Sequence, residues 1–298
     1  MPVWLTSLAK PMVSRTKVVE QYDTNPAANP AGWAFCSKGC EERDLDEHFE
    51  RPERHEPIFN IPRPVLAMLA AMIGVHVVLQ LMPEERSLWW LLAMAFIPGR
   101  YAQGGADLPG GEVAGITSFV THLFVHADVL HLTINGAWLL AFGTPIAKRL
   151  GALRFFLFTF SCGIAGALFF LALHPGLMSP VIGASGAIAG LMGAALRFLF
   201  GALDSGQGPL LRSDPASIVL TPLRSALSDR RIIIATAAFV GLNLFAMIGF
   251  GLFGSSAGAI AWEAHLGGYF FGLFAYGFFD AASQRVAQSQ RGSPTNVA

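Results

Sequence analysis

Six apolar stretches dominate this sequence, and each is long enough to cross a lipid bilayer. A transmembrane helix needs about 20 mostly apolar residues. The stretches are residues 65–82, 116–142, 155–173, 181–203, 232–253 and 257–279. Charged residues make up only 13% of the chain, whereas a soluble domain usually has about 25%. We therefore expect an all-α, polytopic membrane protein, a bundle of six transmembrane helices surrounded by the lipid bilayer.

A seventh apolar run, SLWWLLAMAFIPGR at residues 87–100, follows the first stretch. It offers only about 11 residues before Pro98 and Gly99, fewer than the roughly 20 that a span requires. Its tryptophan pair, Trp89 and Trp90, is typical of the membrane interface. We expect an interfacial helix here, so that the first outer loop is embedded in the membrane.

The basic residues indicate how the helices are oriented, because Lys and Arg are enriched in cytoplasmic loops. With six spans and a cytoplasmic N-terminus, 18 of the 20 Lys and Arg residues are cytoplasmic, and only Arg86 and Arg100 lie outside. A seventh span would move many of these charges to the outside. We therefore expect six spans with both termini in the cytoplasm.

The remaining segments are polar. Residues 1–60 are rich in Pro, Asn, Glu and Arg, a composition typical of a flexible segment. We expect this segment to be cytoplasmic and to precede a six-span domain at residues 61–281. That domain contains a cytoplasmic loop at 204–230, and a cytoplasmic tail follows at 282–298.

Two classes of function receive little support. The formal net charge of zero argues against nucleic-acid binding, which usually requires a basic surface. Cys36 and Cys40 have a spacing that zinc ligands can adopt. However, six residues separate His48 from His55, where about three to five are usual. We expect no metal and no cofactor.

Three histidines and an asparagine lie in the second apolar stretch. Ionisable groups inside a membrane are costly and usually functional. They are His122, His126, His131 and Asn135. At about 100° per residue, His131 and Asn135 share one helix face, and the other two histidines share the opposite face. We expect the first pair to face a cavity and the second pair to face a neighbouring helix or loop. A single helix could not direct all three histidines at one metal ion.

Ser185 lies among small residues in the fourth stretch, and His265 lies near the start of the sixth. Small residues recur every three or four positions in both stretches, which lets two helices approach closely. They are Gly186, Gly190 and Gly193 or Ala194 in the fourth stretch, and Ala264, Gly268 and Gly272 in the sixth. Two helices packed through these residues can bring Ser185 and His265 within hydrogen-bonding distance.

In the six-span topology, Ser185, His265 and the His131–Asn135 pair all lie in the outer half of the membrane. Such groups suffice for acyl transfer: the serine attacks, the histidine accepts its proton, and the pair donates hydrogen bonds to the oxyanion. Glu263 precedes His265 by two residues, which places it about 200° around the helix. We therefore expect a loop-end or surface carboxylate at Glu263, and a Ser–His dyad rather than a triad.

These residues stand in motifs that resemble the rhomboid family of intramembrane serine proteases. The matching motifs are GASG around Ser185, AHLGG around His265 and His-x4-His-x3-Asn at His126, His131 and Asn135. KRLG, just after the second stretch, also resembles the family. Together with the order of motifs, the resemblance covers residues 58–280.

The resemblance implies a protease of a bacterial inner membrane that cleaves transmembrane helices near their outer ends, beside a small residue. Ser185 is implied as the nucleophile and His265 as the general base. The oxyanion hole would comprise the Ser185 backbone amide, His131 and Asn135. Gly183 would shape the loop into the site.

Further residues are implied in supporting roles. Gly186 and Gly268 would allow the helices and the substrate to approach closely. His126 belongs to the histidine motif, and His122 resembles a histidine that ties the second span to the first outer loop.

Two departures from the family pattern leave details open. Some members have an aromatic residue four positions after the serine, which packs on the catalytic histidine, whereas this chain has Ala189. The first outer loop also lacks a matching Trp–Arg pair.

Two other hypotheses are a non-catalytic rhomboid-like adaptor and a histidine-based transporter. The presence of both Ser185 and His265 argues against the adaptor.

Overall fold

The computed structural model describes residues 61–102, 107–252 and 261–280, with side chains left out for 246–252. Within these ranges the chain forms helices and loops, and its extended pairing is limited to one isolated bridge. This confirms the predicted all-α class. The predictions for residues 1–60, including Cys36 and Cys40, and for the tail at 282–298 lie outside the described residues.

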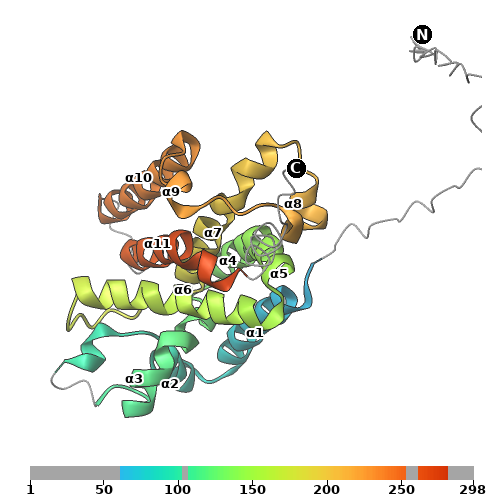
Figure 1. Ribbon diagram of the computed structural model, residues 1–298. Helices are drawn as coiled ribbons and strands as arrows, with labels where there is room; N and C mark the ends of the chain where they lie inside the picture. Colours follow the sequence, from blue (N-terminus) through green and yellow to red (C-terminus); the bar gives the residue numbers. More distant parts are fainter. Residues whose placement is uncertain (1–60, 103–106, 253–260, 281–298) are drawn as a thin grey trace, which may run out of the picture. The chain divides into compact units, whose positions relative to one another are not determined.

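The apolar stretches form the long helices of the structure (Figure 1). Four segments among the described residues are long and apolar enough to cross a membrane. They are α1 (Arg63–Leu81), Val129–Leu150, α6 (Ala152–Leu173) and α7 (Ser185–Asp204). The fifth and sixth stretches form α10 (Arg230–Leu252) and α11 (Trp262–Phe279). The first turn of α11 contains Trp262, Glu263 and His265.

The predicted second span at 116–142 is wrong, because the chain does not continue as one helix there. A helix, α3 (Gly111–Thr121), ends in a short 3₁₀ turn, η4 (His122–Phe124), and a new helix, α4 (Val129–Trp138), then begins. The side chain of Asp128 caps α4 by accepting a hydrogen bond from the amide of His131 at 2.7 Å, as is typical of a helix start. The spanning segment therefore begins at Val129 and not at residue 116.

This spanning segment consists of three helical elements that follow one another directly. After α4 come one π-helical turn, η5 (Leu139–Gly143), and then α5 (Thr144–Leu150). Gly151 separates α5 from α6. The segment Val129–Leu150 therefore carries His131 and Asn135 near its beginning and the KRLG motif at its end.

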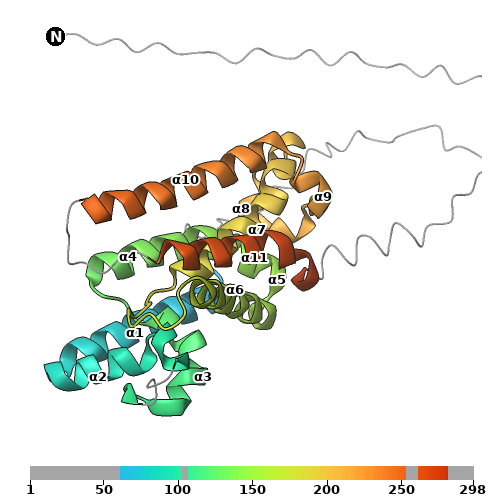
Figure 2. The ribbon, with the colours of Figure 1, turned by 90° about the vertical axis from the view of Figure 1, so that its left-hand side faces the viewer.

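Helix α7 lies at the centre of the bundle. Of its apolar window, 72% is buried within the protein, against 28–39% for the other three candidate spans. Helices α6 and α11 pack against it, and Figures 1 and 2 both show α6, α7 and α11 side by side. The outer helices instead expose large apolar side chains, such as Leu81 of α1 and Leu242 of α10, as expected of surfaces that face lipid tails.

Helices α7 and α11 approach each other through small residues, as the two small-residue stripes predict. A Cβ atom on Gly268 would lie only 2.0 Å from the carbonyl oxygen of Gly186, and one on Gly272 only 1.9 Å from that of Gly190. Any side chain at these positions would overlap the backbone of the facing helix. This close packing fixes the start of α7 beside the start of α11.

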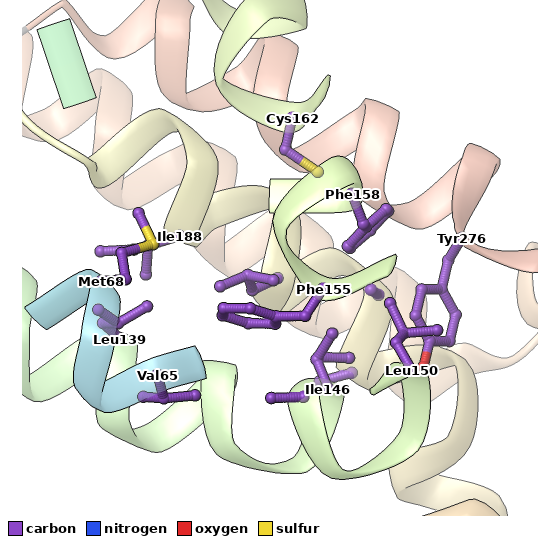
Figure 3. Packing of buried hydrophobic residues seen from close by; sticks show 14 of the residues in the cluster. Val65, Met68, Leu139, Ile146, Leu150, Phe155, Phe158, Cys162, Ile188 and Tyr276 are labelled. Carbon is purple, nitrogen blue, oxygen red and sulfur yellow. The ribbon is translucent and has the colours of Figure 1, made fainter. Parts of the chain in front are cut away.

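A cluster of buried apolar side chains joins the spanning helices (Figure 3). Close packing of this kind makes helix positions sensitive to small changes in volume. The cluster includes Val65 and Met68 of α1, Ile146 and Leu150 of α5, Phe155 and Phe158 of α6, Ile188 of α7 and Tyr276 of α11.

The loop after α1 begins with a short helix, as the apolar run at 87–100 predicts. This is α2 (Glu84–Met94), in which Trp89 and Trp90 are both exposed. A 3₁₀ turn, η2 (Pro98–Tyr101), follows. The predicted loop at 204–230 contains three short helical turns, α8 (Leu210–Ser213), η6 (Pro215–Ser217) and α9 (Leu223–Ala226).

Candidate active site

Ser185 is the first residue of α7, and the segment before it is held by two other parts of the chain. Val181 and Phe96 exchange two backbone hydrogen bonds of 2.8 and 3.0 Å. The amide of Gly183 donates to the carbonyl of His122 at 2.9 Å. The backbone that leads to Ser185 is therefore fixed on both sides.

Ser185 and His265 lie in direct contact. The distance from Ser185 Oγ to Nε2 of His265 is 2.7 Å, a normal length for a hydrogen bond that involves a hydroxyl. Both residues are half-buried. The small-residue contact between α7 and α11 thus brings together the two residues that the sequence singled out.

His131 and Asn135 lie beside the segment that precedes the serine. A Cβ atom on Gly183 would be 2.7 Å from Nε2 of His131 and 3.9 Å from Nδ2 of Asn135. One hydrogen of the Asn135 amide group is used within α4, in a bond to the carbonyl of His131 at 2.9 Å. An amide NH₂ has two hydrogens, so the second is available for a ligand.

The prediction that the histidines point to two opposite faces is wrong for His126. It assumed one continuous helix, whereas the chain turns between His122 and His131. The rings of His126 and His131 lie 5.2 Å apart in an edge-on arrangement. His126 is therefore buried next to the candidate site rather than opposite to it.

His122 lies at the junction of α3 and the loop before α7. Its Nδ1–H donates to the carbonyl of Ser118 at 2.7 Å, and its ring lies 6.1 Å from that of Phe96. Its own carbonyl accepts the Gly183 amide described above. His122 thus contacts both the outer loop and the segment that leads to the serine.

His76 was missed by the sequence analysis. It is a buried residue of α1, and its Nδ1–H donates to the carbonyl of His126 at 3.3 Å. A histidine in an otherwise apolar span was the available signal. The described residues nevertheless contain no group of three His, Cys, Asp or Glu side chains placed to hold a metal ion.

Glu263 lies in the first turn of α11, at a loop end as we expected, but it is not a surface carboxylate. It is 6% exposed and accepts a hydrogen bond of 2.6 Å from Nε2 of His174, which follows the end of α6. The helical offset did separate Glu263 from His265, but the offset alone could not reveal which neighbouring helix covers it. This contact joins α11 to α6.

A second missed residue contacts the dyad directly. Asn243 of α10 is 8% exposed, and its Oδ1 lies 2.8 Å from Nδ1 of His265. An asparagine in the apolar sequence VGLNLF was the signal, because polar residues within spans are usually partnered and functional. The two ring nitrogens of His265 thus contact Asn243 on one side and Ser185 on the other.

Comparison with known protein families identifies the spanning part of the chain. Residues 114–282, more than half of the chain, match the family model described as Rhomboid domain. The matched region includes Ser185, His265, His131 and Asn135.

Three curated relatives show weaker, partial similarity. Rhomboid protease GlpG of Serratia proteamaculans is 28% identical over 155 residues, which cover 50% of this chain and 49% of that protein. Rhomboid protein 1, mitochondrial, of Saccharomyces cerevisiae is 35% identical over 98 residues, 32% of this chain and 28% of that protein. Rhomboid protease GluP of Bacillus subtilis is 29% identical over 157 residues, 52% and 24% of the two chains. The chain thus spans about half or less of the length of these relatives.

Proposed function

This chain belongs to the rhomboid family, and on that premise we propose that it is an intramembrane serine protease that cleaves transmembrane protein substrates. The observation that carries the proposal is the 2.7 Å contact between Ser185 Oγ and His265 Nε2. Two of its relatives, GlpG and GluP, are named rhomboid proteases. The helices are long and apolar enough for an integral membrane protein.

In the proposed reaction, Ser185 is the nucleophile and His265 is the general base. A serine hydroxyl is a weak nucleophile until a base accepts its proton. Nε2 of His265 accepts that proton while Oγ attacks the carbonyl carbon of the scissile peptide bond. A tetrahedral intermediate forms, and its carbonyl oxygen becomes an oxyanion.

Three donors would stabilise this oxyanion. The Ser185 amide lies in the first turn of α7, where N–H groups have no partner within the helix. His131 and Asn135 would supply the other two donors, since both lie against Gly183. Fixed donors in a site that excludes bulk water stabilise developing charge more strongly than water does.

The tetrahedral intermediate would then break down to an acyl-enzyme, as in other serine hydrolases. The C–N bond breaks, and the His265 imidazolium gives its proton to the leaving amine. A water molecule, deprotonated by His265, hydrolyses the acyl-enzyme ester and regenerates the Ser185 hydroxyl. The reaction consumes one water and needs no metal or cofactor.

The substrates would be transmembrane helices cut near their outer ends, because we propose that the dyad lies in the outer half of the membrane. The protein itself would be an integral protein of a bacterial inner membrane, with both termini in the cytoplasm. Residues 61–281 would form the protease domain, and the polar segments at 1–60, 204–230 and 282–298 would lie in the cytoplasm.

An activity probe tests the proposal. A fluorophosphonate should label the purified wild-type protein in detergent but should not label Ser185→Ala. In proteoliposomes, the wild type should cleave a transmembrane substrate and Ser185→Ala should not. Ser217→Ala, which removes a hydroxyl of the 204–230 loop, is the matched control and should label normally. EDTA should leave the cleavage rate unchanged.

Each alternative predicts a different result. A non-catalytic adaptor would neither label nor cleave. Cleavage that survives Ser185→Ala, or that stops with EDTA and returns with zinc, would contradict a serine protease and favour metal chemistry based on the histidines.

A further inference from the structure

Asn243 is a buried polar residue of the apolar helix α10. Both the nitrogen and the oxygen of its side-chain amide have a hydrogen-bonding partner. Nδ2 donates to the carbonyl of Phe239 at 2.8 Å, within α10. Oδ1 lies 2.8 Å from Nδ1 of His265, on α11.

The first of these contacts fixes the orientation of the amide. A carbonyl oxygen can only accept hydrogen bonds, so the amide atom that faces Phe239 must be the NH₂ group. The atom that faces His265 is then the amide oxygen, which can only accept. The hydrogen bond between Asn243 and His265 therefore runs from Nδ1–H of the histidine to Oδ1 of the asparagine.

This direction determines the tautomer of the histidine. A neutral imidazole has a hydrogen on one nitrogen and a lone pair on the other. If Nδ1 holds the hydrogen, Nε2 has the lone pair, and Nε2 is the atom that faces Ser185 Oγ at 2.7 Å. The opposite tautomer would present an N–H to the serine and could not accept its proton.

We propose that Asn243 is a positioning residue that holds His265 in the Nδ1–H tautomer and in the ring orientation that accepts the Ser185 proton. This inference rests on the proposed protease function and adds a third residue, from a third helix, to the Ser–His pair. Asn243 acts through His265 and not on the substrate.

Helix α10 has a second polar contact with α11 that does not involve the dyad, and it provides a matched control. Thr236 Oγ1 lies 2.7 Å from the hydroxyl of Tyr269, about two turns along α10 from Asn243. Thr236→Val removes this contact at nearly constant volume. If Asn243 served only to attach α10 to α11, Thr236→Val would lower turnover as much as a substitution of Asn243 does.

The kinetic test compares Asn243→Leu, Asn243→Asp and Thr236→Val on a transmembrane substrate. Asn243→Leu should lower kcat by about 10²-fold, the lower end of what a positioned general base contributes, and should change KM little. Asn243→Asp retains an acceptor for Nδ1–H and should recover turnover relative to Asn243→Leu. Thr236→Val should cleave like the wild type. Wild-type kcat in Asn243→Leu, or an equal loss in Thr236→Val, would overturn the proposal.

A second measurement does not depend on catalysis. The ¹⁵N chemical shifts of the His265 ring, assigned by comparison with His265→Gln, report which nitrogen holds the hydrogen. The wild type should show the Nδ1–H tautomer, and Asn243→Leu should show a large Nε2–H population. An Nε2–H tautomer in the wild type, or no change in Asn243→Leu, would refute the role of Asn243. A wild-type protein that does not cleave but shows the expected shifts would refute only the protease function.

Discussion

The ring of His131 lies where a side chain on residue 183 would have to be. A Cβ atom on Gly183 would be 2.7 Å from Nε2 of His131, well inside van der Waals contact. Gly183 also has φ = +104°, a conformation that residues with a Cβ rarely adopt. Both the contact and the backbone thus require glycine two residues before Ser185.

Gly183→Ala should therefore lower turnover by about 10²-fold, because a displacement of about 1 Å at a catalytic group can have an effect of this size. The measurement is kcat for a transmembrane substrate, alongside the thermal unfolding midpoint. Gly151→Ala is the control. It has φ = +74° and nothing within 4 Å of a Cβ, so it introduces backbone strain away from the site. An equal loss of turnover in both variants would attribute the effect to strain instead of to His131.

His131→Ala and Asn135→Ala should each reduce kcat without unfolding the protein. Removal of one oxyanion donor typically costs about 10²–10³ in kcat, and the effect should be smaller if the two side chains share the charge. Thr133→Ala is a suitable control, because Thr133 is an exposed residue of the same helix and its hydroxyl bonds to the carbonyl of Val129. A variant of either residue with wild-type kcat would remove that residue from the proposed oxyanion hole.

The spans that could be predicted from sequence are those in which one apolar run becomes one helix. Residues 155–173 are such a run and lie within α6. The prediction of one span at residues 116–142 was wrong because hydropathy does not reveal a break between two helices within an apolar segment. The signal was nevertheless present: Asp128 precedes Val129 as a helix cap, and an Asp directly before an apolar helical pattern marks a start.

The contacts between helices could be anticipated only where small residues specify them. Gly186 and Gly268 are such residues, and the Ser185–His265 contact follows from their packing. Long side chains depend on neighbours that a single helix does not reveal. Glu263 meets His174 of another segment, and Asn243 meets His265 across two helices, so neither partner could be derived from helical periodicity.

The six-span topology can be checked by cysteine labelling from outside the cell. In a variant without the three native cysteines, Asp107→Cys should react with a membrane-impermeant maleimide in intact cells, since residue 107 lies in the loop after α2 and is exposed. Ser213→Cys, exposed at the end of α8, should react only after the membrane is permeabilised. The reverse result would invert the topology that the 18 cytoplasmic Lys and Arg residues favour.

Ser185→Ala and His265→Ala should each abolish cleavage, and the double variant should be no less active than either single one. The two residues perform one step, proton transfer coupled to attack, so loss of either disables that step completely. The measurement is residual cleavage over days, normalised to folded protein. Multiplicative losses in the double variant would indicate that the two residues act independently and would contradict the dyad.

The last prediction concerns stability, where two Arg–Asp pairs in different surroundings should behave differently. Arg149 of α5 and Asp280, just after α11, form an ion pair of 2.7 Å, and both side chains are completely buried. Arg149 also donates to the carbonyls of Pro215 and Ile218 in the loop between α7 and α10. One guanidinium thus ties together three segments that are distant in the sequence.

Arg149→Met should destabilise the protein by about 3–5 kcal/mol, because it removes one partner of a buried ion pair. Arg149→Lys should lie between Met and the wild type, since an ammonium keeps the charge but cannot reproduce the planar fork of donors. Arg231→Met is the control: Arg231 pairs with Asp204 at 2.6 Å, but their side chains are 42% and 59% exposed. Exposed pairs contribute little, so this variant should unfold near the wild-type midpoint in detergent. If Arg149→Met and Arg231→Met unfolded at the same temperature, burial of the Arg149–Asp280 pair would not contribute to stability.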